Sequence, residues 1–163
     1  MGTSVWVMAA LAMVSPQRPA VPMPSVWAGP EAVAVVGNVR LELTVDPTGP
    51  QLPGSELTYA MRYRNLGTKS IANIVILDRV PDHTQFKVGS AQIGTPPPSV
   101  ASITPQYSSD GGATWTYVPM SGGGGAPPSF DANVTHVRFL LVGLLHSGIV
   151  PTVGVSFTVR IRD

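Results

Sequence analysis

The sequence predicts an all-β fold, an antiparallel β-sandwich of about seven strands that follows an extended N-terminal segment. Several segments alternate between apolar and polar residues with period two, as half-buried strands do. Between them lie turn-forming clusters rich in Gly and Pro, of which the 163 residues contain 17 each. No window combines a helical period with caps. We therefore expect residues 31–163 to form one sandwich domain, and residues 1–30 to form an apolar segment with a Pro-rich spacer.

Two early segments alternate regularly between apolar and polar residues. Residues 39–45 and 57–63 each place apolar side chains on one face and mostly polar side chains on the other. Residues 65–67 should turn the chain toward the next strand. The residues expected to face the core are Val39, Leu41, Leu43, Val45, Leu57, Tyr59, Met61 and Tyr63.

The next segment is apolar at every position. Residues 74–77 lack the alternation of a half-buried strand, which indicates a central strand that is covered on both faces. Asp78 and Pro81 are expected to end its pairing, because Pro lacks the N–H that a ladder needs. A shorter strand should follow over residues 86–93.

The second half begins with a loop-rich region and ends with two strands. Residues 94–130 contain runs such as GTPPPS and SGGGGAPPS, which are typical of loops, around one hairpin-like piece at residues 105–119. Residues 133–143 and 152–162 again alternate between apolar and polar residues with period two. Their residues expected to share the inward face are Thr135, Val137, Phe139, Leu141, Val153, Val155, Phe157, Val159 and Ile161.

A set of short motifs occurs in a characteristic order: Pro-Gly, a strand Tyr, Asn-x-Gly, an Asp before a Pro turn, and a Gly ahead of the final strand. They are Pro53, Gly54, Tyr59, Asn65, Gly67, Asp78, Pro81 and Gly148. Over about residues 39–163 the chain resembles the conserved repeat domain of bacterial and archaeal surface proteins, the domain-of-unknown-function family number eleven. The resemblance implies an immunoglobulin-like sandwich in secreted or cell-surface chains, a module that usually occurs in tandem and has no enzymatic activity.

Charge and composition argue against several classes of function. Charged residues make up 12% of the sequence, about half the usual share, and the net charge is +1. Such a weakly charged surface has no field to attract nucleic acid and offers little resistance to self-association. Cys is absent, which excludes disulfides, thiolate catalysis and Cys-ligated zinc. We expect no cofactor and no nucleic-acid partner.

Residues 108–115 fit the Asp-box pattern Ser-x-Asp-x-Gly-x-Thr-Trp, which is a turn motif in sialidase-like propellers. Ser108, Asp110, Gly112 and Trp115 are therefore expected to form a structural turn. The Asp can accept hydrogen bonds from the turn backbone, the Gly can adopt positive φ, and the Trp can pack beneath. A propeller would need several copies of the motif, and the sequence contains one.

No group of residues predicts catalysis. His83, His136 and His146 are far apart in the sequence and lack the spacing of zinc ligands. No nucleophile or pair of acids is placed for hydrolysis, so we expect no enzymatic activity.

Two weaker signals leave alternatives open. The carboxylates of Asp78, Asp82 and Asp131 are candidate calcium ligands, although the sequence has no dense acidic ladder. Asn133 begins a glycosylation sequon, which a chance tripeptide at a strand start explains equally well.

The N-terminal segment has two interpretations. Residues 4–15 contain no charge, and the first charged residue is Arg18. The run is about half the length of a membrane-spanning helix, so no membrane span is expected. It is either a secretory signal peptide, although the usual basic start is missing, or a β-strand that is donated to a neighbouring subunit. The prolines at residues 16, 19, 22, 24 and 30 predict a stiff, extended spacer.

A donated strand would assemble copies of the chain head to tail into an open filament. The predicted assembly residues are Val5, Trp6, Val7, Met8, Ala9, Leu11, Met13 and Val14. One face of the strand would contain Val5, Val7, Ala9, Leu11 and Met13, the other Trp6, Met8, Ala10, Ala12 and Val14. The sequence does not choose between these faces.

The sequence favours an extracellular structural protein at the cell surface, a subunit of a filament or pilus whose main partner is a second copy of itself. Other cells or surfaces are further candidate partners. The alternative is a monomeric secreted adhesion or binding module, in which residues 1–28 are a signal peptide and residues 94–130 face the ligand.

Overall fold

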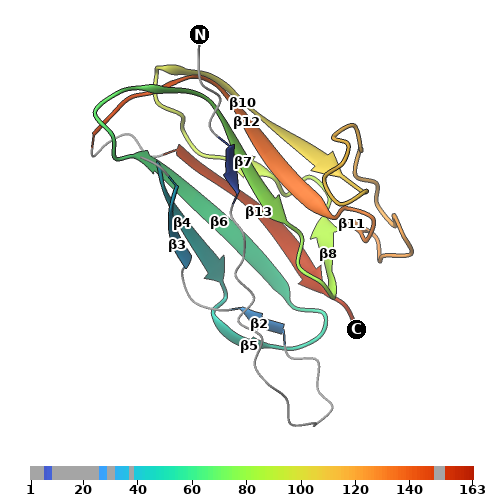
Figure 1. Ribbon diagram of the computed structural model, residues 1–163. Helices are drawn as coiled ribbons and strands as arrows, with labels where there is room; N and C mark the ends of the chain where they lie inside the picture. Colours follow the sequence, from blue (N-terminus) through green and yellow to red (C-terminus); the bar gives the residue numbers. More distant parts are fainter. Residues whose placement is uncertain (1–5, 9–25, 29–31, 37–38, 149–152) are drawn as a thin grey trace.

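The described part of the chain contains thirteen strands, and no residue of that part is helical (Figure 1). The computed structural model describes residues 6–8, 26–28, 32–36, 39–148 and 153–163. The strands are β1 (Trp6–Met8), β2 (Val26–Ala28), β3 (Ala32–Val36), β4 (Val39–Asp46), β5 (Gly49–Gln51), β6 (Glu56–Asn65), β7 (Ile71–Arg79), β8 (Thr84–Lys87), β9 (Gln92–Ile93), β10 (Val100–Ser108), β11 (Phe130–Asp131), β12 (His136–Leu145) and β13 (Val153–Ile161). The predicted all-β fold is confirmed.

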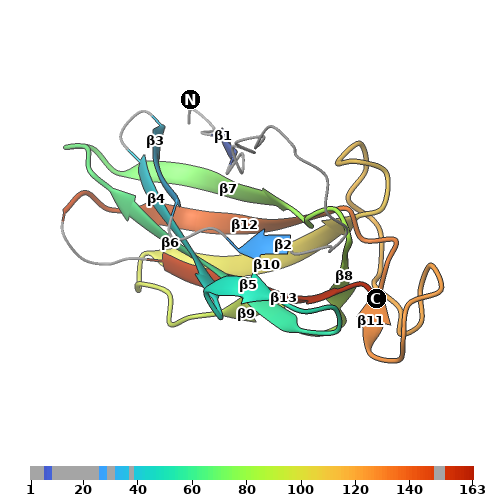
Figure 2. The same ribbon diagram turned by 90° about the horizontal axis from the view of Figure 1, so that it is seen from below.

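Two sheets face each other across a shared core, as the predicted sandwich requires. One sheet has the strand order β1-β7-β12-β10, which Figure 2 shows from one edge to the other. The second sheet has the order β11-β8-β13-β6-β4-β3 with β9 beside β13, and a small separate sheet pairs β2 with β5. Among the described strands the pairs are antiparallel, with the single exception of β1 and β7, which run parallel.

The core between the sheets consists largely of the residues that the period-two pattern places inward. Phe157 stacks on Tyr59 with ring centroids 5.4 Å apart, and Phe86 packs against Phe157 at 6.2 Å. Thr135 is the exception, because it is only half-buried and donates its hydroxyl to the Ser108 carbonyl. The predicted inward residues that are buried are Val39, Leu41, Leu43, Val45, Leu57, Tyr59, Met61, Tyr63, Val137, Phe139, Leu141, Val153, Val155, Phe157, Val159 and Ile161.

The structure has a long strand where the sequence predicts loops. β10 pairs antiparallel with β12 from Val100 to Ser108. Its residues alternate poorly and include Pro105, so they do not look like a strand. Pro lacks a backbone donor, and β10 tolerates it because this strand lies at the edge of its sheet. The loop prediction for residues 94–130 is therefore wrong over residues 100–104, whereas residues 105–108 belong to the predicted hairpin-like piece, in which Tyr107 pairs antiparallel with Tyr117.

Two further differences concern short strands. Residues 32–36, for which the sequence predicts no strand, form β3 and pair with β4. The predicted strand at residues 86–93 is divided into β8 and β9 by a turn at Gly89, whose φ of 76° favours glycine. Both pieces still pair with β13, so the division changes the local path of the chain and not its position in the sheet.

Asn65 holds the turn that the sequence predicts at residues 65–67. It lies at the end of β6 and is 1% exposed. Its Oδ1 accepts a hydrogen bond from the Gly67 N–H at 2.9 Å, which is an Asx turn. Its Nδ2 donates to the carbonyls of Lys69 at 2.8 Å and Leu145 at 2.9 Å. One side chain therefore joins the turn to the end of β12 in the opposite sheet.

Replacing Asn65 by Ala should lower the free energy of unfolding by about 2 to 4 kcal/mol, because three hydrogen bonds are lost and buried partners remain unsatisfied. Urea denaturation followed by fluorescence measures this change. The control is Lys69→Ala, since Lys69 is exposed and contributes its backbone carbonyl to the turn. Equal stabilities of the two variants would contradict the prediction.

Candidate functional site

The N-terminal strand β1 lies at the edge of the four-stranded sheet (Figure 1). It pairs in parallel with β7, and the register sets Trp6 opposite Val75, Val7 opposite Ile76 and Met8 opposite Leu77. These three residues belong to the predicted assembly segment. The other predicted assembly residues, Val5, Ala9, Leu11, Met13 and Val14, lie outside the described residues.

β7 has a long partner on one side and a short one on the other. β12 pairs with it from Ile71 to Arg79, with one irregularity in the register. On the other side, within the described residues, only the three positions from Val75 to Leu77 have a strand opposite. An edge strand presents backbone N–H and C=O groups that can pair with a further strand. The edge of β7 is therefore longer than the part that β1 covers.

Both faces of β7 are apolar. Ile74 and Ile76 face the core and are 1% and 0% exposed. Val75 and Leu77 point to the other face and are half-buried, and Leu140 of β12 lies opposite Val75. From this double-sided pattern the sequence predicts a central strand. A strand with two apolar faces is stabilised when both faces are covered.

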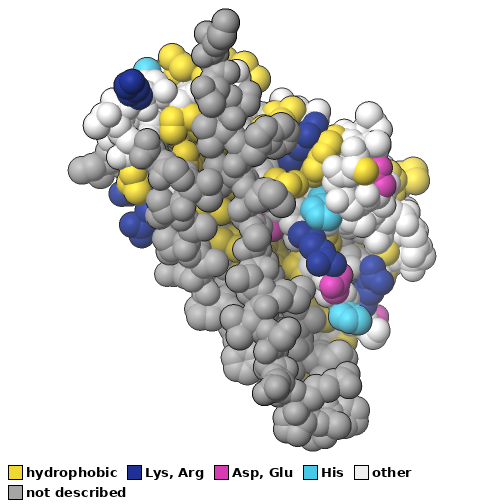
Figure 3. Space-filling view, viewed as in Figure 1, with side chains coloured by type: hydrophobic (Ala, Val, Ile, Leu, Met, Phe, Trp, Pro, Cys, Tyr) yellow, Lys and Arg dark blue, Asp and Glu magenta, His cyan; other side chains and the backbone are white. Residues whose placement is uncertain are grey.

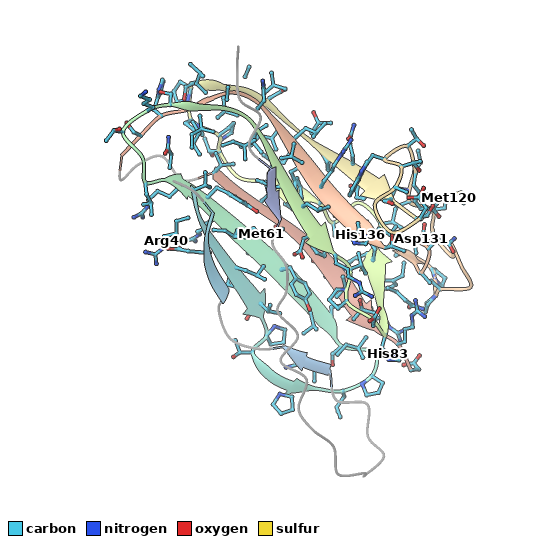
Figure 4. All side chains as sticks on the ribbon, viewed as in Figure 1. Arg40, Met61, His83, Met120, Asp131 and His136 are labelled. Atoms are coloured by element: carbon cyan, nitrogen blue, oxygen red, sulfur yellow. The ribbon has the colours of Figure 1, made fainter. Side chains whose placement is uncertain are left out.

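Charged and histidine side chains gather around the end of β7, beyond its apolar part (Figure 3). Arg79 forms an ion pair with Asp82, and His136 lies opposite Arg79 on β12. Figure 4 shows His136 and His83 on this side of the molecule. Burial, and then the charge of Arg79, lower the pKa of His136. The apolar part of β7 thus ends at a charged border.

Asp78 is the buried acid of β7. It was expected to end the strand, but β7 continues to Arg79 and Asp78 pairs with Val137. Asp78 is 3% exposed, and its Oδ1 accepts a hydrogen bond from the Arg79 N–H at 2.8 Å. Its Oδ2 has no hydrogen-bond partner among the described residues. Burial raises the pKa of Asp78 to about 7, although the Arg79 N–H acts in the opposite direction.

The negative charge of Asp78 affects the pKa of two tyrosines of β6, in the opposite sheet. Burial, and then that negative charge, raise the pKa of Tyr59 to about 12, and the same two causes raise the pKa of Tyr63. The Tyr63 hydroxyl is buried and has no partner within the described part of the chain. Asp78 therefore lies in an apolar interior that favours its protonated form.

Changing Asp78 to Asn should flatten the pH dependence of stability. The fold raises the pKa of Asp78 from 3.8 to about 7, so the folded state binds this proton more tightly than the unfolded state does. The resulting stabilisation is complete below about pH 4, decreases as the pH rises, and is lost above about pH 7, a total of about 4 kcal/mol. Urea denaturation of both proteins between pH 4 and pH 8 measures the difference.

The matched control for this experiment is Asp82→Asn, which removes an exposed carboxylate four residues further along the chain. It should retain the decrease in stability between pH 4 and pH 8, because Asp78 remains in place. Parallel profiles for the wild type and Asp78→Asn would show that the prediction is wrong.

The residues of the Asp-box pattern form a hydrogen-bonded turn. Ser108 is fully buried, and its hydroxyl donates to Asp110 Oδ1 at 2.6 Å and accepts from the Gly112 N–H at 2.8 Å. Asp110 also accepts from the N–H and the hydroxyl of Thr114, at 2.9 and 2.7 Å. The Ser108 hydroxyl, and then Thr114, lower the pKa of Asp110 to about 2. The carboxylate is thus held ionised within the turn and is poorly suited to donate a proton.

Trp115 attaches this turn to the four-stranded sheet. A Cβ added at Gly112 would lie 3.5 Å from the Trp115 ring, so the ring packs directly against the turn. The guanidinium carbon of Arg138 lies 4.4 Å from the ring centroid, and His136 meets the ring edge-on at 6.5 Å. Arg138 also donates its Nε–H to Gln106 Oε1 at 2.8 Å. Side chains of β10 and β12 therefore fix the position of the turn.

Ser108→Ala should lower the free energy of unfolding by about 1 to 3 kcal/mol, because it leaves the part-buried N–H groups of Asp110 and Gly112 without their acceptor. The neighbouring Ser109→Ala is the control, since Ser109 is exposed and should change stability by less than about 0.5 kcal/mol. Chemical denaturation gives both values. A loss for Ser108→Ala no larger than that of the control would refute the structural role of this hydroxyl.

A second network surrounds Asp131, which is fully buried. Its carboxylate accepts hydrogen bonds from the Tyr117 hydroxyl at 2.9 Å, the Met120 N–H at 2.7 Å and the Asn133 N–H at 2.8 Å. Figure 4 shows Asp131 and Met120 close to each other, in the loop region that follows β10. Sequence reasoning considered Asp131 only as a calcium ligand. Its local signal was an Asx turn to Asn133, which says nothing of the more distant partners.

Asn133, the candidate glycosylation acceptor, is exposed at the surface. Its Nδ2 donates to the Tyr117 hydroxyl at 3.2 Å. The hydroxyl of Thr135, the third residue of the sequon, donates to the Ser108 carbonyl at 3.0 Å and accepts from the Gly111 N–H at 3.1 Å. Both polar side chains of the sequon therefore have partners within the folded domain.

The structure does not bring the candidate calcium ligands together. Asp78 lies in the core, Asp82 pairs with Arg79, and Asp131 is held by loop residues. Within the described residues there is no group of three or more His, Cys, Asp or Glu side chains that could hold a metal ion. A shallow pocket between β6, β9 and β13 has Arg62 as its only charged lining residue, which does not form an acid–base pair.

Comparison with known proteins finds no match to the chain among family models, curated proteins or solved structures. The resemblance to the conserved repeat domain of surface proteins therefore stays a prediction. In the described ranges, the structure contains no helix with the length and apolar character needed to cross a membrane.

Proposed function

We propose that the protein is an extracellular, non-enzymatic structural protein, a subunit of a surface filament or pilus that is assembled by donation of the N-terminal segment to a neighbouring subunit. The observation that carries the proposal is the pairing of β1 with the edge of β7. The strand comes from the segment that the sequence predicts as the assembly strand, and it lies in a position that any copy of the same segment can occupy.

The β7 edge has the properties of an acceptor. It offers backbone groups for main-chain hydrogen bonds, and its apolar side chains extend on both faces from Ile74 to Leu77. Backbone pairing supplies affinity in strand addition, and alternate side chains supply specificity. Burial of about five apolar side chains of a donated strand would contribute very roughly 5 to 10 kcal/mol before the cost of ordering. Main-chain hydrogen bonds along the edge add to this burial, and together they support a durable contact between subunits.

The sequence of the spacer supports exchange between subunits. The 11 residues from 15 to 25, between the predicted assembly residues and β2, contain prolines at four positions and predict an extended chain. Fully extended, such a spacer reaches about 34 Å. A folded domain of this size has a diameter of about 35 Å. The donated segment can therefore reach a neighbouring sandwich that lies against its own, and repeated donation from head to tail gives an open filament.

The composition is consistent with close association of many copies. A net charge of +1 and a charged fraction of 12% create little electrostatic repulsion between subunits. The extracellular location rests on the resemblance to repeat domains of surface proteins.

A second candidate function is a monomeric secreted adhesion or binding module, with residues 1–28 as a signal peptide. The observation that favours it is the exposed apolar tip of the loop after β10, where Val118 is 73% and Met120 is 57% exposed. Large exposed apolar side chains on a loop fixed by Asp131 are suited to contact a partner.

Sedimentation of the full chain and of a form that begins at Gly29 tests the proposal. We expect the full chain to form large uniform polymers and the shorter form to remain a monomer, because it lacks the donated strand. A matched pair of point variants avoids dependence on truncation: Val7→Asp should abolish the polymers, whereas Gln17→Asp places the same charge in the spacer and should preserve them. Monomers in every sample would overturn the filament proposal and leave the binding module.

A further inference from the structure

We propose that the donated segment runs parallel to β7 of its neighbour in the register that β1 adopts within the chain, with Val7 opposite Ile76. This inference rests on the proposed function and deepens it, because it names the direction, the register and the inserted face of the donated strand. The partner that fits the β7 edge is the N-terminal segment of a second copy.

The direction follows from the pairing in the structure. β1 and β7 form the only parallel pair among the described strands, with Val7 opposite Ile76 and its two neighbours opposite Val75 and Leu77. When an identical element is exchanged between copies, it makes in the neighbouring copy the contacts that it makes in its own chain. A strand that β7 accepts in parallel from its own chain is therefore accepted in parallel from the next.

The register also selects the inserted face. Ile74, Ile76 and Asp78 of β7 face the core, whereas Val75 and Leu77 lie on the other face. Partners in a parallel pair occupy the same face of the sheet. In the donated strand, the core-facing positions are then those of Val5, Val7, Ala9, Leu11 and Met13. A slip by one residue would exchange the two faces and place the position of Trp6 or Met8 opposite Ile76.

Asp78 distinguishes this register from slips by two residues, which keep the same face inward. If the donated strand keeps this register beyond Met8, Ala9 comes opposite Asp78, whereas slips by two residues set Val7 or Leu11 there. Asp78 is buried and its Oδ2 lacks a partner among the described residues. A larger aliphatic side chain beside this carboxyl would exclude more water from it, which is costly. The smallest residue of the inserted face therefore fits best.

The absence of Cys from the chain makes a disulfide test of this register direct. Four single variants are prepared: Trp6→Cys, Met8→Cys, Val75→Cys and Leu77→Cys. Each donor variant is unfolded together with one acceptor variant that carries a size tag, refolded, sedimented and oxidised. In the proposed register, Cys at 6 meets Cys at 75 and Cys at 8 meets Cys at 77. An antiparallel strand centred on the same pair of residues would instead join 6 with 77 and 8 with 75.

We expect mixed disulfide dimers from the pairs 6–75 and 8–77 at about tenfold the yield of the pairs 6–77 and 8–75, because only Cα atoms within about 7 Å can be bridged. Polymers that cross-link mainly through 6–77 and 8–75, or through neither set, overturn the register and leave the filament intact. Mixtures that sediment as monomers without mixed dimers overturn the filament proposal itself, and this inference with it. Sedimentation of each variant alone shows whether its substitution has impaired assembly.

Discussion

The edge of β7 that faces away from β12 presents backbone N–H and C=O groups that need partners, and the proposed behaviour of the molecule follows from this requirement. Ile74 and Ile76 cover the core, and Val75 and Leu77 are half-buried on the other face. β12 satisfies one edge of the strand, and the N-terminal segment pairs with the other. A strand supplied through a long spacer is exchangeable between copies, unlike a strand held by a tight hairpin. Fold stability and assembly would then use the same backbone hydrogen bonds.

Selectivity at this edge has to come from short-range fit, since a chain of net charge +1 produces no strong long-range field. Two features of β7 restrict which strands fit against its edge. The apolar part of β7 ends at Arg79, which pairs with Asp82 in solvent. Just before it, the carboxyl of Asp78 faces the interior, where burial raises its pKa to about 7. Burying this carboxyl costs free energy, and a purely structural strand would avoid that cost with an apolar residue.

Side-chain hydrogen bonds hold the region after β10, where regular pairing is sparse. Ser108 and Asp110 bind the backbone of one turn, and Asp131 binds three donors of the next loop. The first network could be predicted, because all its members lie within eight residues and follow a turn pattern. The second could not, because Tyr117 and Asp131 are brought together only when the loop folds back.

The sequence by itself determined the fold class and the inward faces of β4, β6, β12 and β13, because the alternation of side chains is a local property of an extended backbone. It also identified the N-terminal segment as unusual. Only the tertiary structure decided that β10 exists, that Asp78 lies inside the core, and that β1 pairs in parallel with β7 through Val7 and Ile76. These features depend on which distant segments meet, and pairing between distant strands leaves no periodic signal in either segment alone.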